Sequence, residues 1–174
     1  MLRLFVGIEF PPELKLDLSL LCSGMPGARW VDPGNLHLTL RFIGEVDEGA
    51  AGDVDAALVR IQARRFDLSL AGVGHFGDRM LWAGVEKSLP LVHLRDKVES
   101  ALVRLGFEPE TRRYAPHVTL ARLRNANEAK LQEFLAAHAL FRAEPFPVEK
   151  FSLVASYLTK AGAIYEDQAD YGLD

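Results

Sequence analysis

The chain has 174 residues, of which 49% are hydrophobic and 25% are charged, and its formal net charge is −4. This composition is ordinary for one globular domain, and the acidic balance argues against a general nucleic-acid coat protein, which would be basic. Cys22 is the single cysteine, so the chain has neither a disulfide framework nor a cysteine metal cluster. No apolar run approaches the roughly 18 residues of a membrane span, and the first residues suit a strand better than a signal peptide. We therefore expect a cytoplasmic protein without membrane attachment.

Hydrophobic spacing and turn residues predict a mixture of strands and helices along the chain. In chain order, the expected elements are a strand at 2–8, a helix at 12–23, strands at 28–31 and 36–43, a helix at 48–64, a hairpin of strands 66–76 and 80–85, a helix at 90–105, a strand at 117–123, a helix at 128–138, and a final antiparallel pair at 146–158 and 163–168. The first helix begins at Pro11-Pro12, although the leucines from Leu14 to Leu20 also alternate as they would in a strand.

The order strand, helix, strand, helix, strand occurs twice, roughly at residues 2–76 and 79–158. We interpret this repetition as an internal duplication within a single bilobal domain that covers residues 1–174. The predicted fold class is α+β, with two pseudo-symmetric lobes that each hold an antiparallel sheet and carry helices on its outer face. An approximate two-fold axis between the lobes would bring equivalent strands together across a central active-site cleft.

One four-residue pattern also occurs twice, as His37-Leu38-Thr39-Leu40 and as His117-Val118-Thr119-Leu120. Side chains two residues apart share one face of a strand, so each copy presents an imidazole beside a hydroxyl and buries two aliphatic residues behind them. The chain contains only four threonines, so two His-x-Thr pairs among its five histidines exceed what chance would give. The repeated pattern therefore predicts a functional site.

Two such histidines could carry out acid–base chemistry at neutral pH, because an unperturbed imidazole has a pKa of about 6.5. One ring takes a proton and the other gives one, and each positioned group contributes on the order of 10²–10⁴-fold to a rate. The hydroxyls of Thr39 and Thr119 suit the non-bridging oxygens of a phosphate. In-line displacement at phosphorus needs the attacking and leaving oxygens on opposite sides, which two equivalent groups would serve. The residues leave open which histidine gives the proton.

Arginines near both motifs could offset the charge of a phosphate. Arg41 follows His37 at an even spacing and shares its face if the strand is regular. Arg122 follows His117 at an odd spacing, so it falls on the opposite face unless a bulge or the strand end turns it back. No His-x-His pattern or acidic cluster accompanies either motif, and we expect no bound metal and no cofactor.

Three stretches resemble those of a known family: RLFVGIEFP at 3–11, RWVDPGNLHLTLRFIGEV at 29–46 and RRYAPHVTLARL at 112–123. They are similar to bacterial and archaeal RNA 2′,3′-cyclic phosphodiesterases, the 2′-5′ RNA ligase family of the two-histidine (2H) phosphoesterase superfamily. The resemblance implies metal-independent hydrolysis of a 2′,3′-cyclic phosphate to a 2′-phosphomonoester.

The resemblance also implies roles for the motif residues. His37 would be the proton donor and His117 the proton acceptor, while the two threonines would hold the phosphate. The candidate substrate-binding residues, from the family and from the arginine spacing together, are Arg122, Arg41, Phe5, Trp30 and Phe42. Trp30 suits base stacking and the core equally well, and the two phenylalanines are more typical of a core.

The expected partners are RNA 3′ ends that carry a 2′,3′-cyclic phosphate, with tRNA fragments as one candidate source, and the protein is expected to act as a monomer. Two other activities stay open, which are 2′-5′ RNA ligation and hydrolysis of a small cyclic nucleotide. A non-catalytic RNA-end binder is a third alternative, although the retention of both complete motifs argues against it.

Overall fold

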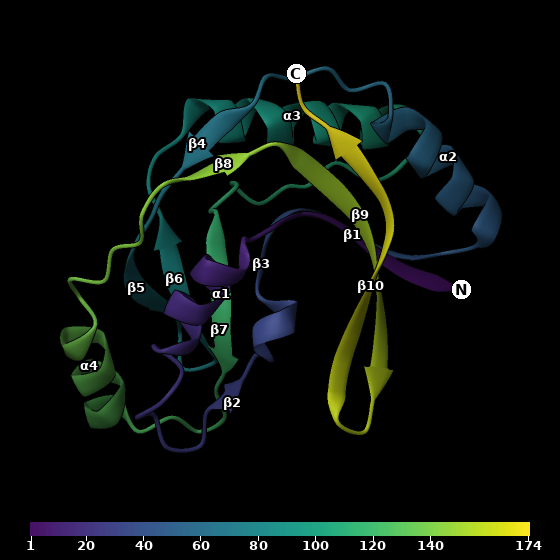
Figure 1. The fold of residues 1–174 in the computed structure, drawn as a ribbon. Helices are drawn as coiled ribbons and strands as arrows, with labels where there is room; N and C mark the ends of the chain where they lie inside the picture. Colours follow the sequence, from purple (N-terminus) through teal and green to yellow (C-terminus); the bar gives the residue numbers. More distant parts are fainter.

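The computed structural model describes residues 1–174 (Figure 1). The helices are α1 (Pro12–Ser19), α2 (Glu48–Leu58), α3 (Leu89–Arg104) and α4 (Glu128–Ala137), with a 3₁₀ turn, η1, at Pro33–Asn35. The strands are β1 (Leu2–Glu9), β2 (Arg29–Trp30), β3 (His37–Val46), β4 (Phe66–Leu68), β5 (Leu70–Phe76), β6 (Met80–Val85), β7 (His117–Arg122), β8 (Phe146–Val148), β9 (Lys150–Thr159) and β10 (Gly162–Gly172). No helix combines the length and the apolar character that a membrane crossing requires.

The helices begin where the sequence offers a cap or a proline. The side chains of Asp47, Ser88 and Asn127 each accept a hydrogen bond from a backbone N–H in the first turn of α2, α3 and α4. These bonds satisfy donors that have no partner within the helix. Pro12 opens α1, so the helical interpretation of this segment is confirmed and the strand alternative is wrong.

Two of the expected strands are each divided in the structure. Ser69 separates β4 from β5, and Glu149 separates β8 from β9. β4 and β8 pair with each other as a two-stranded antiparallel ribbon, whereas β5 and β9 enter the two large sheets. Each break lets one stretch of chain serve two sheets, which the alternation of apolar residues alone does not reveal.

The two four-stranded sheets do not follow the two halves of the sequence. Sheet A has the strand order β10-β9-β1-β3, and sheet B has the order β2-β7-β6-β5, with every pair of neighbours antiparallel. β9 of the second half therefore pairs with β1 of the first, and β5 of the first half pairs with β6 of the second. The α+β class is confirmed, but each sheet is built from both halves. The duplication and its limits at 2–76 and 79–158 stay predictions, as does the single domain over 1–174.

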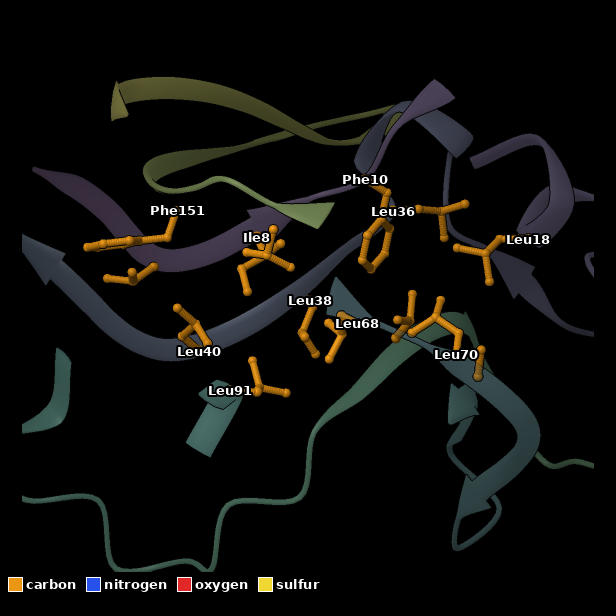
Figure 2. Close-up of a cluster of buried hydrophobic side chains, with 14 of the residues drawn as sticks. Ile8, Phe10, Leu18, Leu36, Leu38, Leu40, Leu68, Leu70, Leu91 and Phe151 are labelled. Atoms are coloured by element: carbon orange, nitrogen blue, oxygen red, sulfur yellow. The ribbon is translucent and has the colours of Figure 1, made fainter. Parts of the chain in front are cut away.

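A continuous core of 36 buried residues extends between the two sheets. In this core, Leu38 and Leu40 of β3 point toward Leu68 of β4 and Leu91 of α3 (Figure 2). The motif strand thus fills the core with the aliphatic residues of its His-x-Thr pattern. Its histidine and threonine are left for the opposite face.

The helices lie against the sheet faces that carry buried residues. The hydroxyl of Tyr171 on β10 donates to the carboxylate of Asp55 on α2 at 2.6 Å. In sheet B, the indole of Trp30 on β2 packs against Phe134 on α4 with ring centroids 5.9 Å apart. Figure 1 shows α2 and α3 along one side of the molecule and α4 at another.

Candidate active site

β3 and β7 bring the two His-x-Thr pairs together. The aliphatic residues of both motifs are at most 2% exposed, whereas the histidines and threonines on the other face are only partly covered. The two strands contact each other, and the charge of His117 is near enough to His37 to lower the pKa of that imidazole. We refer to His37, Thr39, His117 and Thr119 as the central site.

Both imidazoles are held in the same way. Nδ1 of His37 lies 2.7 Å from the carbonyl oxygen of Asn35, and Nδ1 of His117 lies 2.7 Å from that of Ala115. A carbonyl only accepts, so Nδ1 carries the hydrogen in each ring and Nε2 is the nitrogen that gains or loses a proton. In His37, Nε2 lies 2.8 Å from Oγ1 of Thr39. The backbone thereby fixes one tautomer in each ring, and in His37 it turns Nε2 toward Thr39.

His37 has a pKa below the ordinary value of 6.5 for histidine, chiefly because burial disfavours the charged ring. The carbonyl of Asn35 favours the charged form and opposes this effect, while the positive charges of His117 and Lys15 add to it. In the free protein at neutral pH, His37 is therefore a neutral imidazole.

The lowered pKa of His37 predicts a specific loss of stability in acid. The unfolded chain takes up a proton at this histidine at a higher pH than the folded chain does, so the free energy of unfolding falls as the pH decreases below about 6.5. His37→Gln removes this contribution. We expect the stability of the native protein relative to the variant to decrease between pH 8 and pH 5 in urea-unfolding measurements. A constant difference between the two proteins over this range would contradict the prediction.

Each motif strand contains a bulge directly after its threonine. Leu40 and Leu120 have no partner in the pairing of β3 with β1 and of β7 with β6. A bulge adds one residue and reverses the alternation of faces beyond it. Arg41 and Ala121 are therefore buried beside the bulged leucines, and Arg122 is exposed.

The expectation that Arg41 shares a face with His37 is wrong, because it assumed a regular strand. The Arg41 guanidinium is 9% exposed and pairs with Glu99 of α3 at 3.2 Å. It also donates hydrogen bonds to the carbonyls of Phe42 and Glu108. Arg41 joins β3 to α3 and to the segment that follows α3, on the side of β3 away from the central site.

The bulge has the opposite effect on Arg122 and returns it to the face of Thr119, which is the alternative that the sequence left open. Met80 of β6 links the two residues. Its sulfur accepts a hydrogen bond from Oγ1 of Thr119 at 3.6 Å, and its backbone lies directly opposite Arg122. Burial raises the pKa of Tyr165 on β10, and the positive charge of Arg122 partly offsets this increase. Arg122 of sheet B therefore lies near enough to interact with Tyr165 of sheet A.

Aromatic rings surround His37. Phe5 stacks on the imidazole with ring centroids 4.6 Å apart, and Phe42, which is 66% exposed, lies 6.1 Å from Phe5. Tyr165, which is not part of either motif, lies 5.3 Å from His37. Gly7 permits this packing, since a Cβ at that position would lie 3.4 Å from the His37 ring and 3.0 Å from a backbone oxygen. Phe5 and Phe42 are therefore beside the site. Phe5 is buried as a core residue would be, whereas the expectation of a core position is wrong for the exposed Phe42.

A second aromatic group lies at His117 and was also missed from the sequence. Phe76 meets the imidazole edge to face at 4.9 Å, and the indole of Trp82 lies 6.5 Å away. The indole lies over Gly74 of the neighbouring strand, where any side chain would collide with it. Trp30 is not part of either group, because its ring packs on α4. A signal was available for Trp82, because LWAGV at 81–85 repeats LFVGI at 4–8 and puts Trp82 in the position of Phe5.

A pocket of about 140 Å³ adjoins the central site beside His37 and Phe5, and Lys15, Asn35 and Tyr165 also line it. Two larger hollows, of about 560 and 600 Å³, lie along α3 and contain none of the predicted site residues. No group of three or more histidine, cysteine, aspartate or glutamate side chains is arranged to hold a metal ion.

Two antiparallel sheets that each present a His-x-Thr strand to a common site define a 2H phosphoesterase. The sequence profile of the 2′-5′ RNA ligase superfamily matches residues 27–159, and the chain belongs to this family.

The chain is similar to several relatives over nearly its whole length. The RNA 2′,3′-cyclic phosphodiesterase of Aeropyrum pernix is 37% identical over 158 residues, which is 87% of this chain and 89% of the relative. The protein of the same name from Methanothermobacter thermautotrophicus is 32% identical and covers 98% of both chains. The crystal structure of E. coli LigT complexed with 3′-AMP superposes with a TM-score of 0.82 at 28% identity, over 99% of this chain and 98% of that one.

Proposed function

We propose that the protein hydrolyses 2′,3′-cyclic phosphates at RNA 3′ ends to 2′-phosphomonoesters without a metal ion. The observation that carries this proposal is the pair of equivalent His-x-Thr strands, each with Nδ1 of its histidine held by a backbone carbonyl at 2.7 Å. This arrangement supplies a proton acceptor and a proton donor on two sides of one phosphate. The relatives named as RNA 2′,3′-cyclic phosphodiesterases support the choice of substrate.

In the proposed reaction, Nε2 of His117 takes a proton from water, and the water oxygen attacks phosphorus. The bond between phosphorus and the 3′ oxygen breaks, and Nε2 of His37 gives its proton to that oxygen. The products are a 2′-phosphate and a free 3′ hydroxyl, and the catalyst is restored when a proton passes from His117 to His37. Thr39 and Thr119 donate hydrogen bonds to the non-bridging oxygens, and Arg122 offsets their charge.

The lowered pKa of His37 must be reconciled with its proposed role as the proton donor. A proton donor must carry a proton when the reaction begins, yet burial keeps the free imidazole neutral at pH 7. An anionic phosphate beside the ring favours the charged imidazolium. We propose that substrate binding raises the pKa of His37 and so prepares the donor.

The proposal also covers the cellular location and the oligomeric state of the protein. We place the protein in the cytoplasm as a monomer that acts on RNA fragments, including fragments of tRNA. The single cysteine, Cys22, forms no disulfide, which suits a reducing compartment. Light scattering after size exclusion would test the monomer, since a mass near 19.3 kDa is expected.

A defined oligonucleotide with a 2′,3′-cyclic phosphate tests the reaction, its regiochemistry and its metal independence together. We expect a 2′-phosphomonoester as the only product, at the same rate with and without EDTA. The product is identified by its resistance to an enzyme that removes only 3′-phosphates, with a synthetic 3′-phosphate oligonucleotide as the control. A 3′-phosphate product would overturn the assigned leaving group, and a requirement for a divalent ion would overturn the mechanism.

A further inference from the structure

The short strand β2 lies at the edge of sheet B and pairs with the C-terminal end of β7 (Figure 1). Arg29 lies directly opposite Arg122, and Trp30 lies opposite Ala121. The N–H of Val31 continues the pairing by donating to the carbonyl of Leu120 at 2.8 Å. The backbone pairing of β2 with β7 therefore determines the position of Arg29 relative to Arg122.

The same pairing determines which way Arg29 points. Residues directly opposite each other in an antiparallel pair place their side chains on the same face. Trp30 and Ala121 share the face that packs on α4, where the Trp30 ring meets Phe134. Because neighbours along a strand alternate, Arg29 and Arg122 share the other face. That face carries Thr119, which Met80 connects to Arg122 as described above.

Two arginines in this arrangement lack a stabilising partner within the protein. Like charges directly opposite each other destabilise a sheet. Both side chains are exposed, and neither forms an ion pair within 4.0 Å. Arg41 of sheet A, by contrast, is buried and paired with Glu99. An anion that lies across the pair would remove the repulsion.

We propose that Arg29 binds the phosphodiester that joins the terminal nucleotide to the rest of the RNA, while Arg122 binds the cyclic phosphate. Directly opposite residues of an antiparallel pair lie about 4.5–5.5 Å apart, and their long side chains can diverge, so the two guanidinium groups can contact two successive phosphates of one strand. Arginine suits this contact because its planar fork matches two phosphate oxygens at once. The inference rests on the proposed function and deepens it, since it makes an RNA end, not a mononucleotide, the preferred substrate.

The test compares two substrates that differ by this phosphodiester. One is a nucleoside 2′,3′-cyclic phosphate without a 5′-phosphate, and the other is a dinucleotide with the same terminal nucleotide. We expect Arg29→Ala to lower kcat/KM about ten-fold on the dinucleotide and less than about two-fold on the mononucleotide. Arg29→Lys should recover part of the loss. The salt dependence of dinucleotide binding, as the slope of log K against log salt, should decrease by about 0.7.

Arg60→Ala is the charge-matched control, because Arg60 is exposed beyond α2 and lines the hollow along α3. We expect this variant to treat both substrates as the native protein does. An equal loss on both substrates in Arg29→Ala, or an equal loss on the dinucleotide in Arg60→Ala, would overturn the proposal.

Failure of this inference can be distinguished from failure of the proposed function. If Arg29→Ala hydrolyses both substrates at the native rate, the phosphodiester contact is refuted while the hydrolase remains. Titration of the dinucleotide 2′-phosphate by calorimetry gives a readout that needs no turnover. A weaker affinity in Arg29→Ala than in Arg60→Ala supports the contact even if no cyclic phosphate is hydrolysed, and equal affinities refute it.

Discussion

Replacing either histidine of the central site by alanine is expected to lower kcat for cyclic-phosphate hydrolysis by about 10²–10⁴-fold. A positioned acid or base contributes about this much, and each imidazole has a different task that the other cannot perform. Both replacements should leave the fold intact, because His37 and His117 lie on the face opposite the buried aliphatic residues. Single-turnover rates with a cyclic-phosphate oligonucleotide in EDTA measure the effect. Circular dichroism and urea unfolding at pH 8 verify the fold.

His75→Ala provides the matched control for these variants. His75 also has Nδ1 beside a backbone carbonyl, that of Gly77 at 2.6 Å, and it lies on β5 of sheet B. No threonine follows it at the second position, and it pairs with the buried Leu81 and not with Trp82. We expect native activity in this variant. A residual rate within about ten-fold of native in His117→Ala would show that this histidine is not the proton acceptor.

Glu99→Ala is expected to lower the free energy of unfolding by about 3–5 kcal/mol, the usual effect of removing one partner of a buried ion pair. The side chains of Glu99 and Arg41 are 15% and 9% exposed, and the carboxylate also pairs with Arg95 at 3.2 Å. Without Glu99, the buried Arg41 guanidinium loses its only counter-charge in a place that water reaches poorly, while Arg95 keeps only its pair with the exposed Asp96. Urea unfolding at neutral pH, with the slope checked for a two-state transition, measures the change.

The control for this variant is Glu133→Ala, which removes an exposed ion pair with Lys130 and should change stability by less than about 1 kcal/mol. Replacing both partners, as Arg41→Met with Glu99→Leu, should restore much of the lost stability. If this double variant folds and hydrolyses the cyclic phosphate normally, Arg41 has a structural role and does not bind substrate. A loss of less than about 1 kcal/mol in Glu99→Ala would contradict the importance of the pair.

The sequence was sufficient to find the central site, because the inference used only local geometry. A spacing of two residues puts His37 and Thr39 on one face, whatever the rest of the fold does. The repetition at His117 and Thr119 then indicated a second strand of the same kind. The roles of these four residues remain predictions until the variants are measured.

Local geometry did not correctly predict the positions of Arg41 and Arg122, because both lie beyond a bulge. A bulge inserts one residue, so the side chains that follow it point to the opposite faces of the sheet. The bulged residues, Leu40 and Leu120, are leucines, and a leucine in a strand does not predict a bulge. Arg41 was therefore placed on the wrong side of β3, and the position of Arg122 could only be stated as two alternatives. The ladders that reveal the bulges join β3 to β1 and β7 to β6, which are distant in the chain.

The aromatic residues Tyr165, Phe76 and Trp82 were not predicted at the site for a related reason. Tyr165 reaches His37 because β10 lies in the same sheet as β3, and nothing near Tyr165 in the sequence indicates that sheet order. The sequence also did not predict the exchange of β5 and β9, in which each strand joins the sheet that holds the first strand of the other half. Each of these strands has the same apolar alternation whether it pairs with its own half or with the other.

This exchange has a consequence for how the protein is made. As a chain grows from its N-terminus, sheet B has all its strands once β7 has been synthesised, whereas sheet A must wait for β9 and β10. Until then, β1 has an open edge and only β3 beside it, and two strands alone are marginally stable. Such an edge invites pairing with other chains. We expect the nascent polypeptide to pass through a stage with one complete sheet, and His37 to reach its final environment only at the end of translation.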